Sequence, residues 1–495
     1  MRTVPVTLHL TSRFYGENPM EPVARRGSSL SLTALNAGGH RPRARGKCAR
    51  GRSRAGPCAP GPAGLLAHDV SLEHAIRLCR PESMQIPGRA ALLVAFILVS
   101  PSGVFAEDWP GWRGPRGDGS SSEKTVPVKW SATENIAWKT PITGGGHASP
   151  IVWGDRVFTV TAVAETEGRD LVCLDRKSGR VIWQKTVITS PFERKHKLNS
   201  HASSTPATDG KLVYVAFLDV RDMVVAAYDF EGNPKWLVRP GAFSSVHGFC
   251  SSPVIYKDKL IVNGDHDGAS YIVALDRATG ATAWKTPRAN KTRSYCVPII
   301  RELSGRTQMI LSGDKSVASY NPDTGKLHWI LDGPTEQWVA SIVYNPRADL
   351  LFVTGGFPDH HIFGLRHNGS GLIGEKEFAW HHTRPSWVSY VPSPISEGDY
   401  FLIVSDQGYA CCFNAKTGEL KWDQKLGAHH ASLVSANGLV YFIADNGVTT
   451  VVKPGPAYEA VATNPLGAQV FASPAISNGQ IFIRGDKHLF AIGKK

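Results

Sequence analysis

Short hydrophobic runs alternate with polar turns over residues 136–495, and four such runs make up a unit that repeats along the chain. The clearest unit is "SSPVIYKDKLIVNGDHDGASYIVALDRATGATAWKT" (residues 251–286). Its runs "SPVIY", "LIVNG", "YIVALD" and "ATAWKT" predict four short strands, named A to D, because turn residues separate them. Asp or Asn with Gly supplies the positive φ angle that a tight hairpin turn needs. Each unit is therefore expected to form a four-stranded antiparallel sheet.

Tryptophan marks the period of the repeat. Seven tryptophans fall 42 to 53 residues apart, most of them after a phrase such as "LDRATGATAW" or "FNAKTGELKW": Trp138, Trp183, Trp236, Trp284, Trp329, Trp380 and Trp422. A period in the forties with four strands per unit indicates the blades of a propeller. The last unit ends after its third strand, whereas "IAWKTP" (136–141) has the pattern of an isolated fourth strand. We predict an all-β, eight-bladed β-propeller over residues 136–495, in which this N-terminal strand completes the last blade.

The phrase Asp-x-x-x-Gly-x-x-x-Trp, with its Thr-Gly or Ser-Gly turn, resembles the repeat of the pyrroloquinoline-quinone (PQQ) family. That family includes eight-bladed quinoprotein dehydrogenases and non-enzymatic propellers such as the outer-membrane assembly lipoprotein. The resemblance implies that the seven tryptophans dock neighbouring blades. The stretch "DWPGWRGPRGDG" (108–119) is similar to the start of secreted bacterial members. Because the family contains both enzymes and scaffolds, the resemblance leaves the function open.

The N-terminal region has a different composition from the repeats. Residues 1–83 hold 12 Arg and one Lys against five acidic residues and have no hydrophobic periodicity, so they are expected to be a disordered basic leader. Two interpretations stay open: a real extension, or an upstream stretch of a chain that starts at Met84. Residues 84–106 combine Arg89, an apolar run of ten residues and a small-residue site ending at Ala106, which predicts a signal peptide.

The charge distribution and the apolar run predict where the protein is located and which partners it does not bind. Residues 107–495 carry 41 basic and 37 acidic residues, so most of the net charge of +13 belongs to the leader, and nucleic-acid binding is not expected. The apolar run is too short to cross a bilayer, and we expect no transmembrane helix in the mature body. Cleavage near Ala106 would leave a secreted or periplasmic protein, made of an N-terminal segment (107–135) and the propeller.

Five cysteines lie in the mature body, and two of them, Cys411 and Cys412, are adjacent. Both fall in a predicted strand C, at positions that other units fill with small or apolar residues. Successive strand residues point to opposite faces, so we interpret the two as packing residues and not as a redox pair. Cys250 and Cys296 stay open between a thiol pair, a disulfide and packing.

Histidines concentrate on one predicted face of the propeller, which carries the B–C loops and the D–A connections. Eleven of the 14 histidines of the mature body fall there, four of them near the start of a strand A: His147, His201, His247 and His430. A cluster at the axis is where a small ligand or a metal would bind. The ligand-binding candidates are these four histidines with Trp338, Trp387 and Arg293, and the metal candidates are His247, Cys250, Cys296, Asp265 and His266. For any single residue of this set, a structural role is the simpler interpretation.

Two functions from different classes remain. The first is a binding or scaffold module that presents the histidine-rich face to a protein partner or small ligand. The second is an oxidoreductase that uses PQQ with calcium, or a transition metal, at the axis, as the family resemblance implies. Asp267 is a weak candidate for the catalytic base, but no Glu–Asn–Asp set matches the quinoprotein pattern and no Cys-x-x-Cys-His haem motif is present. Whether the protein is an enzyme is left open, and the binding role is preferred.

Overall fold

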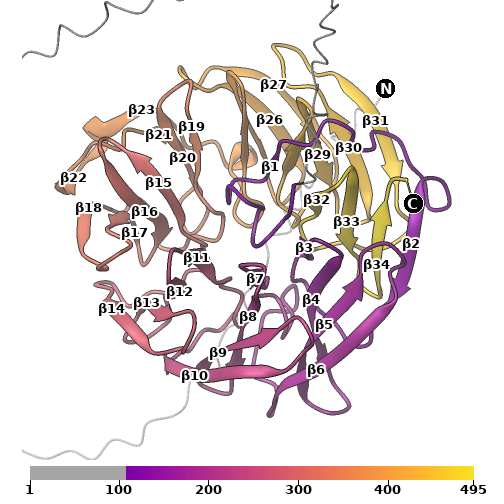
Figure 1. Ribbon diagram of the computed structural model, residues 1–495. Coiled ribbons are helices and arrows are strands. Elements are labelled where there is room, and N and C mark those ends of the chain that lie inside the picture. Colours follow the sequence, from indigo (N-terminus) through magenta and orange to yellow (C-terminus); the bar gives the residue numbers. More distant parts are fainter. Residues whose placement is uncertain (1–106, 495) are drawn as a thin grey trace, which may run out of the picture. The chain divides into compact units, whose positions relative to one another are not determined.

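The computed structural model describes residues 107–494, in which eight β-sheets stand side by side around a central axis (Figure 1). The predicted signal peptide and leader lie outside these residues. Helical structure in the described range is limited to two 3-10 turns, η1 (Glu375–Glu377) and η2 (Pro385–Trp387). Within the same range, no helix is long and apolar enough to cross a membrane. The predicted eight-bladed, all-β propeller is confirmed.

The blades follow one another in chain order, with strand A innermost and strand D outermost. Blade 1 holds β3 (Ile151–Trp153), β4 (Arg156–Val163), β5 (Gly168–Asp175) and β6 (Val181–Thr189). Blade 2 holds β7 (Ala207–Thr208), β8 (Leu212–Asp219), β9 (Asp222–Asp229) and β10 (Pro234–Ala242). Blade 3 holds β11 (Val254–Tyr256), β12 (Lys259–Gly264), β13 (Tyr271–Asp276) and β14 (Thr282–Pro287). Blade 4 holds β15 (Ile299–Leu303), β16 (Arg306–Gly313), β17 (Ser316–Tyr320), β18 (Leu327–Asp332) and an added outer strand, β22 (Gly371–Ile373).

The second half repeats this order. Blade 5 holds β19 (Val343–Asn345), β20 (Leu350–Gly355), β21 (His361–Leu365) and β23 (Phe378–His382). Blade 6 holds β24 (Ile395–Glu397), β25 (Tyr400–Val404), β26 (Tyr409–Asn414) and β27 (Leu420–Lys425). Blade 7 holds β28 (Val434–Ala436), β29 (Leu439–Ile443), β30 (Val448–Val452), β31 (Ala460–Pro465) and an added inner strand, β1 (Ser120–Ser121). Blade 8 holds β32 (Ala475–Ser477), β33 (Gln480–Arg484), β34 (His488–Ile492) and β2 (Ile136–Pro141).

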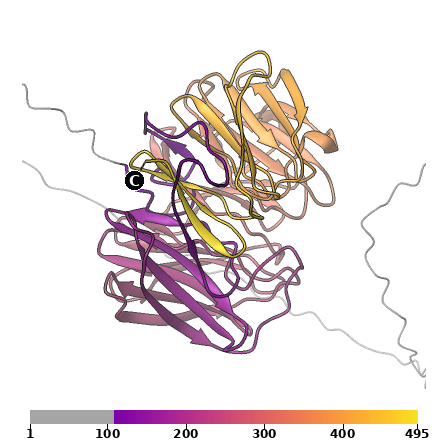
Figure 2. The same cartoon turned by 90° about the vertical axis from the view of Figure 1, so that its right-hand side faces the viewer.

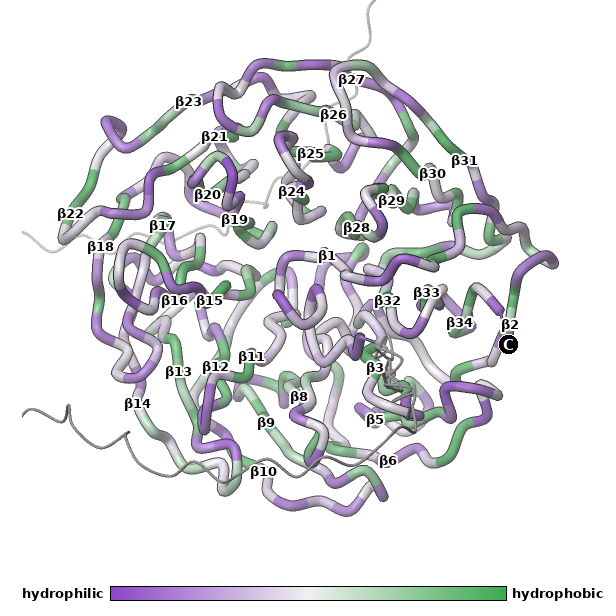
Figure 3. The backbone as a smooth tube through the Cα atoms, turned by 45° about the horizontal axis from the view of Figure 1, so that its top comes forward, coloured by the Kyte–Doolittle hydropathy of each residue, from purple (hydrophilic) through white to green (hydrophobic). Residues whose placement is uncertain are grey.

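The ring closes as the sequence predicted. Strand β2 pairs antiparallel with β34, so a strand from the N-terminal side supplies strand D of the last blade. Hydrophobic stretches lie along the middle strands of the blades, and the turns between them are hydrophilic (Figure 3). Since neighbouring strands are antiparallel, the B–C loops and D–A connections share one face, named the histidine face below, and the A–B and C–D turns share the opposite face.

The residues before β2 form a second closing device, the axial segment (residues 107–123). Figure 2 shows this segment, in indigo, crossing between the magenta and the orange blades. Trp109 bridges to Val152 of blade 1, and β1 pairs parallel with β28 of blade 7. Hydrogen bonds join the segment to five further blades, at Thr208, Arg301, Ser341, Pro394 and Asn478. The segment therefore ties seven blades together at or next to their strands A.

Side chains pack in separate layers between neighbouring blades, and the adjacent cysteines illustrate this. Cys411 belongs to the cluster between blades 5 and 6, with Phe352 and Phe401. Cys412 belongs to the cluster between blades 6 and 7, with Leu433. Both are fully buried, both are free thiols, and burial raises the pKa of Cys412 to about 12. The predicted packing role of the pair is confirmed.

Tryptophan side chains join the outer parts of the blades. In six of the seven predicted cases the indole Nε1–H donates to a backbone carbonyl in the C–D turn of the next blade. The pairs are Trp138–Arg176 (2.7 Å), Trp183–Phe230 (2.9 Å), Trp236–Arg277 (3.1 Å), Trp284–Pro322 (3.1 Å), Trp380–Ala415 (3.0 Å) and Trp422–Gly455 (3.1 Å). Each bond satisfies a buried or half-buried donor and so fixes the angle between two sheets.

Trp329 departs from the predicted docking role. Its Nε1–H donates to Oε1 of Gln308 at 2.8 Å, within its own blade, and its ring is fully buried. The C–D connection of blade 5 is longer than the others and sends out β22, which pairs parallel with β18 at Trp329. The acceptor turn that Trp329 would need is therefore missing at this joint.

Candidate binding site at the propeller axis

A ring of small hydroxyl residues surrounds the axis at the start of strand A in seven of the eight blades. The phrase Ala-Ser-Pro, or a variant of it, precedes strand A and places the second residue inward in seven blades: Ser149, Thr205, Ser252, Ser341, Ser393, Ser432 and Ser473. In blade 4 the position is Val297. A backbone N–H donates to the hydroxyl of the next blade in five places, for example from Ser393 to Ser432 at 2.9 Å and from Ser432 to Ser473 at 2.9 Å. The ring holds the blades in register around the axis.

An axial cavity of about 130 Å³ opens within this ring, on the side of the histidine face. Every blade contributes to its wall, and Trp112 of the axial segment lies at the end away from that face, where its Nε1–H donates to Ser341 Oγ at 3.1 Å. Hydroxyl, imidazole, thiol and apolar groups line the cavity, and the lining includes no Lys, Arg, Asp or Glu side chain: His147, Leu198, Asn199, Ser203, Cys250, Ser252, Tyr295, Val297, Val339, Ser341, Val391, Ser393, His430, Ser432, Phe471 and Ser473, with Trp112.

Two of the predicted histidines face each other across Phe471 at the cavity rim. The centroid of the Phe471 ring lies 4.9 Å from that of His147 and 5.1 Å from that of His430. Burial and the nearby positive groups lower the pKa of His147 to about 4. His430 is also partly buried, but its hydrogen bond of 2.8 Å to Asp445 raises its pKa. One rim histidine is therefore neutral at pH 6, and the other is held close to a carboxylate that favours its charged form.

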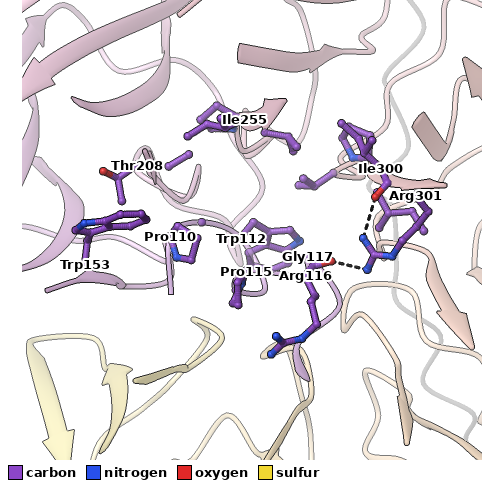
Figure 4. Close-up of a pocket in the computed structure, with 18 residues that line it drawn as sticks. Pro110, Trp112, Pro115, Arg116, Gly117, Trp153, Thr208, Ile255, Ile300 and Arg301 are labelled. Carbon is purple, nitrogen blue, oxygen red and sulfur yellow. Dashed lines mark hydrogen bonds between the residues drawn. The ribbon is translucent and has the colours of Figure 1, made fainter. Parts of the chain in front are cut away.

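A larger cavity of about 310 Å³ lies on the other side of Trp112, between the axial segment and the ends of strands A in blades 1 to 4. Figure 4 shows Trp153 and Thr208 at one end and Ile300 and Arg301 at the other, with Pro110, Trp112 and Pro115 along the axial segment. The backbone carbonyl of Arg116 accepts a hydrogen bond from Arg301, which fastens the segment at that end. Sequence analysis did not predict this cavity, because it forms between segments far apart in the chain.

Three of the predicted ligand-binding residues have structural partners near the rim. His201 stacks on Phe192 at 4.2 Å and its Nε2 contacts the carbonyl of Glu193 at 2.9 Å. The Nδ1 of His247 lies 3.1 Å from the hydroxyl of Tyr295, and burial lowers its pKa. Arg293 pairs with Asp267, the weak candidate for the catalytic base, at 3.0 Å.

The two predicted tryptophans do not reach the axial cavity. Trp338 is fully buried in the cluster between blades 4 and 5, where its ring lies edge-on to Phe363. Trp387 packs beside blade 6 and donates its Nε1–H to Asp423 at 3.1 Å. Neither lies where it would stack on an axial ligand, since each ring is held in the packing between blades.

The predicted metal candidates do not form a metal site. Among residues 107–494, no group of three or more His, Cys, Asp or Glu side chains is arranged to hold a metal ion. Asp265 pairs with the buried Arg288 at 2.9 Å, and His266 Nδ1 contacts the carbonyl of Gly264 at 2.9 Å. Cys250 and Cys296 are free thiols, and burial raises the pKa of each to about 12. His247, described above, lies against Tyr295.

Comparison with known proteins identifies the repeat. The family described as outer membrane protein assembly factor BamB matches residues 120–192, 167–349 and 376–454, which together exceed half of the chain. The chain belongs to this family. The family is a set of PQQ-repeat propellers, in agreement with the resemblance carried by the Asp-x-x-x-Gly-x-x-x-Trp phrase.

Solved structures of related folds are distant in sequence. BamB from Moraxella catarrhalis is 15% identical, with a TM-score of 0.49, and the match covers 73% of this chain and 97% of that one. A europium-containing methanol dehydrogenase is 11% identical, with a TM-score of 0.48, over 77% of this chain and 90% of the other. A quinohemoprotein alcohol dehydrogenase from Comamonas testosteroni is 12% identical, with a TM-score of 0.45, over 78% and 81%. No protein of curated function matches the chain.

The residues present do not fit PQQ with calcium. The axial cavity is smaller than the roughly 300 Å³ at which small-molecule sites begin. Its lining offers no carboxylate for calcium, which binds oxygen ligands such as Asp and Glu.

Proposed function

We propose that this propeller is a binding module that holds a protein partner on its histidine face, over the mouth of the axial cavity. The observation that carries the proposal is the composition of this rim. Leu198 is 38% exposed and Val246 is 46% exposed, and both lie in D–A connections beside half-buried histidines. Exposed apolar side chains that gather on one face and are rimmed by polar groups mark protein interaction sites, whereas isolated ones do not.

The fixed geometry of the rim supports the same role. Connections on the surface of a rigid scaffold are common places for binding residues. Here Asn199 Nδ2 donates to the carbonyl of His247 at 2.7 Å, and the backbone N–H of His196 donates to the same carbonyl at 3.3 Å. Two consecutive D–A connections are therefore joined to each other, so a partner would meet an ordered surface. With the predicted signal peptide, we place this binding role in a secreted or periplasmic protein.

The oxidoreductase alternative receives no separate support. The Asp267 carboxylate is paired with Arg293, the predicted metal candidates form no group of three among the described residues that could hold a metal ion, and the axial cavity is too small for PQQ. A planar cofactor would also need a stacking ring at the axis, and Trp338 and Trp387 are held elsewhere. The scaffold proposal needs none of these groups.

Site-specific photo-crosslinking in the cells that produce the protein tests the proposal. A crosslinking residue would replace Leu198 or Val246 on the histidine face. Matched controls would replace Leu237 (39% exposed) and Leu327 (48% exposed), which have the same exposure but lie on outer strands D. We expect one discrete crosslinked protein from positions 198 and 246 and none from 237 and 327. Equal products at all four positions, or none at 198 and 246, would contradict the proposed face.

A further inference from the structure

Arg484 is a buried charge without a partner. It is 0% exposed, and its Nε, Nη1 and Nη2 atoms form no hydrogen bond to any residue in the range 107–494. The other fully buried arginines are compensated: Arg169 pairs with Glu193, Arg288 pairs with Asp265, and Arg113 donates to two backbone carbonyls. Leaving a buried guanidinium without an anion or a hydrogen-bond acceptor is destabilising.

The repeat shows where the Arg484 side chain is directed. Arg484 lies two residues after the β33 residue that pairs with the first residue of strand A. Asn263 and Ser312 hold the same position in blades 3 and 4. Asn263 Nδ2 donates to the carbonyl of Cys296 at 3.0 Å, and Ser312 Oγ to that of Ala340 at 3.4 Å, in each case just before strand A of the next blade. By this equivalence, Arg484 is directed toward the start of blade 1, beside the axial cavity.

The electrostatics at this corner of the cavity point the same way. Burial, Lys195, His430 and Arg484, in that order, lower the pKa of His147, and His147 lines the cavity. Every charged group that acts on His147 is therefore positive. Burial lowers the pKa of Arg484 itself to about 10, against the opposing effect of the Asp486 carboxylate, and the guanidinium remains charged at neutral pH. An electropositive, enclosed corner attracts an anion.

We propose that the corner formed by Arg484 and His147 binds a carboxylate that enters the axial cavity from the histidine face. The guanidinium offers Nε, Nη1 and Nη2 in a planar fork that matches the two oxygens of a carboxylate. A cavity of about 130 Å³ admits such a head group and little more. Arg484 is not among the residues that line the cavity, so the proposed binding requires displacement of the cavity wall at His147. This inference rests on the proposed binding role of the histidine face, and it names the chemistry that the face recognises.

Thermal unfolding of the full chain in acetate tests the proposal. Acetamide, which has a similar shape and no charge, is the control ligand, and sodium chloride matches the ionic strength. We expect saturating acetate to raise Tm by about 3 °C and acetamide to leave Tm unchanged. Arg484→Met should abolish the response and unfold at the same or a higher temperature without acetate, because it removes an uncompensated charge. Arg169→Met, at an equally buried but paired arginine, should unfold at a lower temperature and keep the acetate response.

A second measurement reports on the corner directly. Bound acetate should raise the pKa of the His147 imidazole, followed by NMR, in the native protein and not in Arg484→Met. If acetate and chloride act alike on the native protein and on Arg484→Met, water alone satisfies the guanidinium and the proposal is wrong. An equal response to inorganic phosphate would show a general anion site and would overturn the assignment to a carboxylate.

Two sources could supply the carboxylate, and the two experiments distinguish them. If the carboxylate belongs to a small free acid, we expect only the acetate response. An acidic side chain of the partner also predicts that Arg484→Met reduces the crosslinked product at position 198. If the native protein shows no acetate response but still gives the crosslinked product, the carboxylate site is wrong and the proposed function stands. Absence of the crosslinked product with the acetate response intact would overturn the partner face and leave the carboxylate site standing.

Discussion

At the joint between blades 3 and 4, Trp284 donates its indole N–H to the carbonyl of Pro322 in the next blade. At the following joint, between blades 4 and 5, Trp329 occupies the equivalent place and bonds Gln308 of its own blade. The tryptophan is the same in both joints, so the difference comes from the blade that should accept the bond. Asn321 shapes the acceptor turn of blade 4, where its Oδ1 accepts the backbone N–H groups of Asp323 and Thr324.

Blade 5 has Arg366 at the position of Asn321, and a guanidinium donates hydrogen bonds but cannot accept the backbone N–H groups that hold the tight turn. The Arg366 guanidinium instead donates to the carbonyls of Lys376 and Phe378, at the far end of the longer connection. Polar contacts then fasten the longer connection to blade 4: Gln308 Nε2 donates to the carbonyl of His367 at 3.0 Å, and Ser304 Oγ lies 2.8 Å from His367 Nδ1. The docking repeat therefore depends on its Asp or Asn as much as on its Trp.

Replacing each of these tryptophans by alanine should give the largest difference in stability between the two joints. Trp329→Ala should reduce the free energy of unfolding by about 3–5 kcal/mol, because it empties a fully buried site. Trp284→Ala should cost about 1–3 kcal/mol, because that ring is only half buried and loses one hydrogen bond. Urea unfolding of the two variants measures both values. Equal losses would show that the docking bond, and not burial, sets the strength of the joints.

A glycine in the acceptor turn gives the next largest effect. Gly280 has a φ angle of +76°, and a Cβ placed there would lie 2.8 Å from the ring of Trp236. Gly280→Ala should therefore cost about 2–3 kcal/mol, from the positive φ angle and from displacement of the docked ring. Gly438→Ala is the matched control, since its φ angle is +72° and nothing lies within 4 Å of its Cβ, and it should cost about 1 kcal/mol. Urea midpoints that do not differ would show that the ring yields without cost.

The two joints also show which features of the fold can be predicted from the sequence and which cannot. Strand positions, the eight blades and the closure by residues 136–141 follow from local patterns that each unit repeats. The altered phrase around Arg366 is visible in the sequence, but its consequence, β22 on the neighbouring blade, depends on a contact between units. The seventh unit has no tryptophan, and Trp130 of the N-terminal segment stacks on Tyr441 at that joint instead.

The candidate site was predicted in part. His147 and His430 line the axial cavity because every strand A begins at the axis. Trp338 also lies shortly before a strand A, but its ring packs in the layer between blades 4 and 5. The spacing of residues along the chain does not fix the direction of this side chain. The hydroxyl ring could have been found from the repeated Ser before Pro. The floor made by Trp112 could not, because residues 107–123 contact strands more than 300 positions away.

The smallest expected effect is a dependence of stability on pH at the joint between blades 4 and 5, which lacks the tryptophan docking bond. The hydrogen bond from His367, followed by that from Tyr344, lowers the pKa of Asp349 below its usual range. Because the folded-state pKa is depressed, Asp349 stabilises the fold above its unfolded-state pKa of about 3.9, and this contribution is lost as the pH falls through the folded-state value. Asp349→Asn should therefore lower the urea midpoint slightly at pH 6 and have less effect at pH 3. Because Asp349 is 69% exposed, we expect a small difference. A midpoint for Asp349→Asn that differs from the native value by the same amount at both pH values would show that the carboxylate charge does not hold the connection of blade 5 in place.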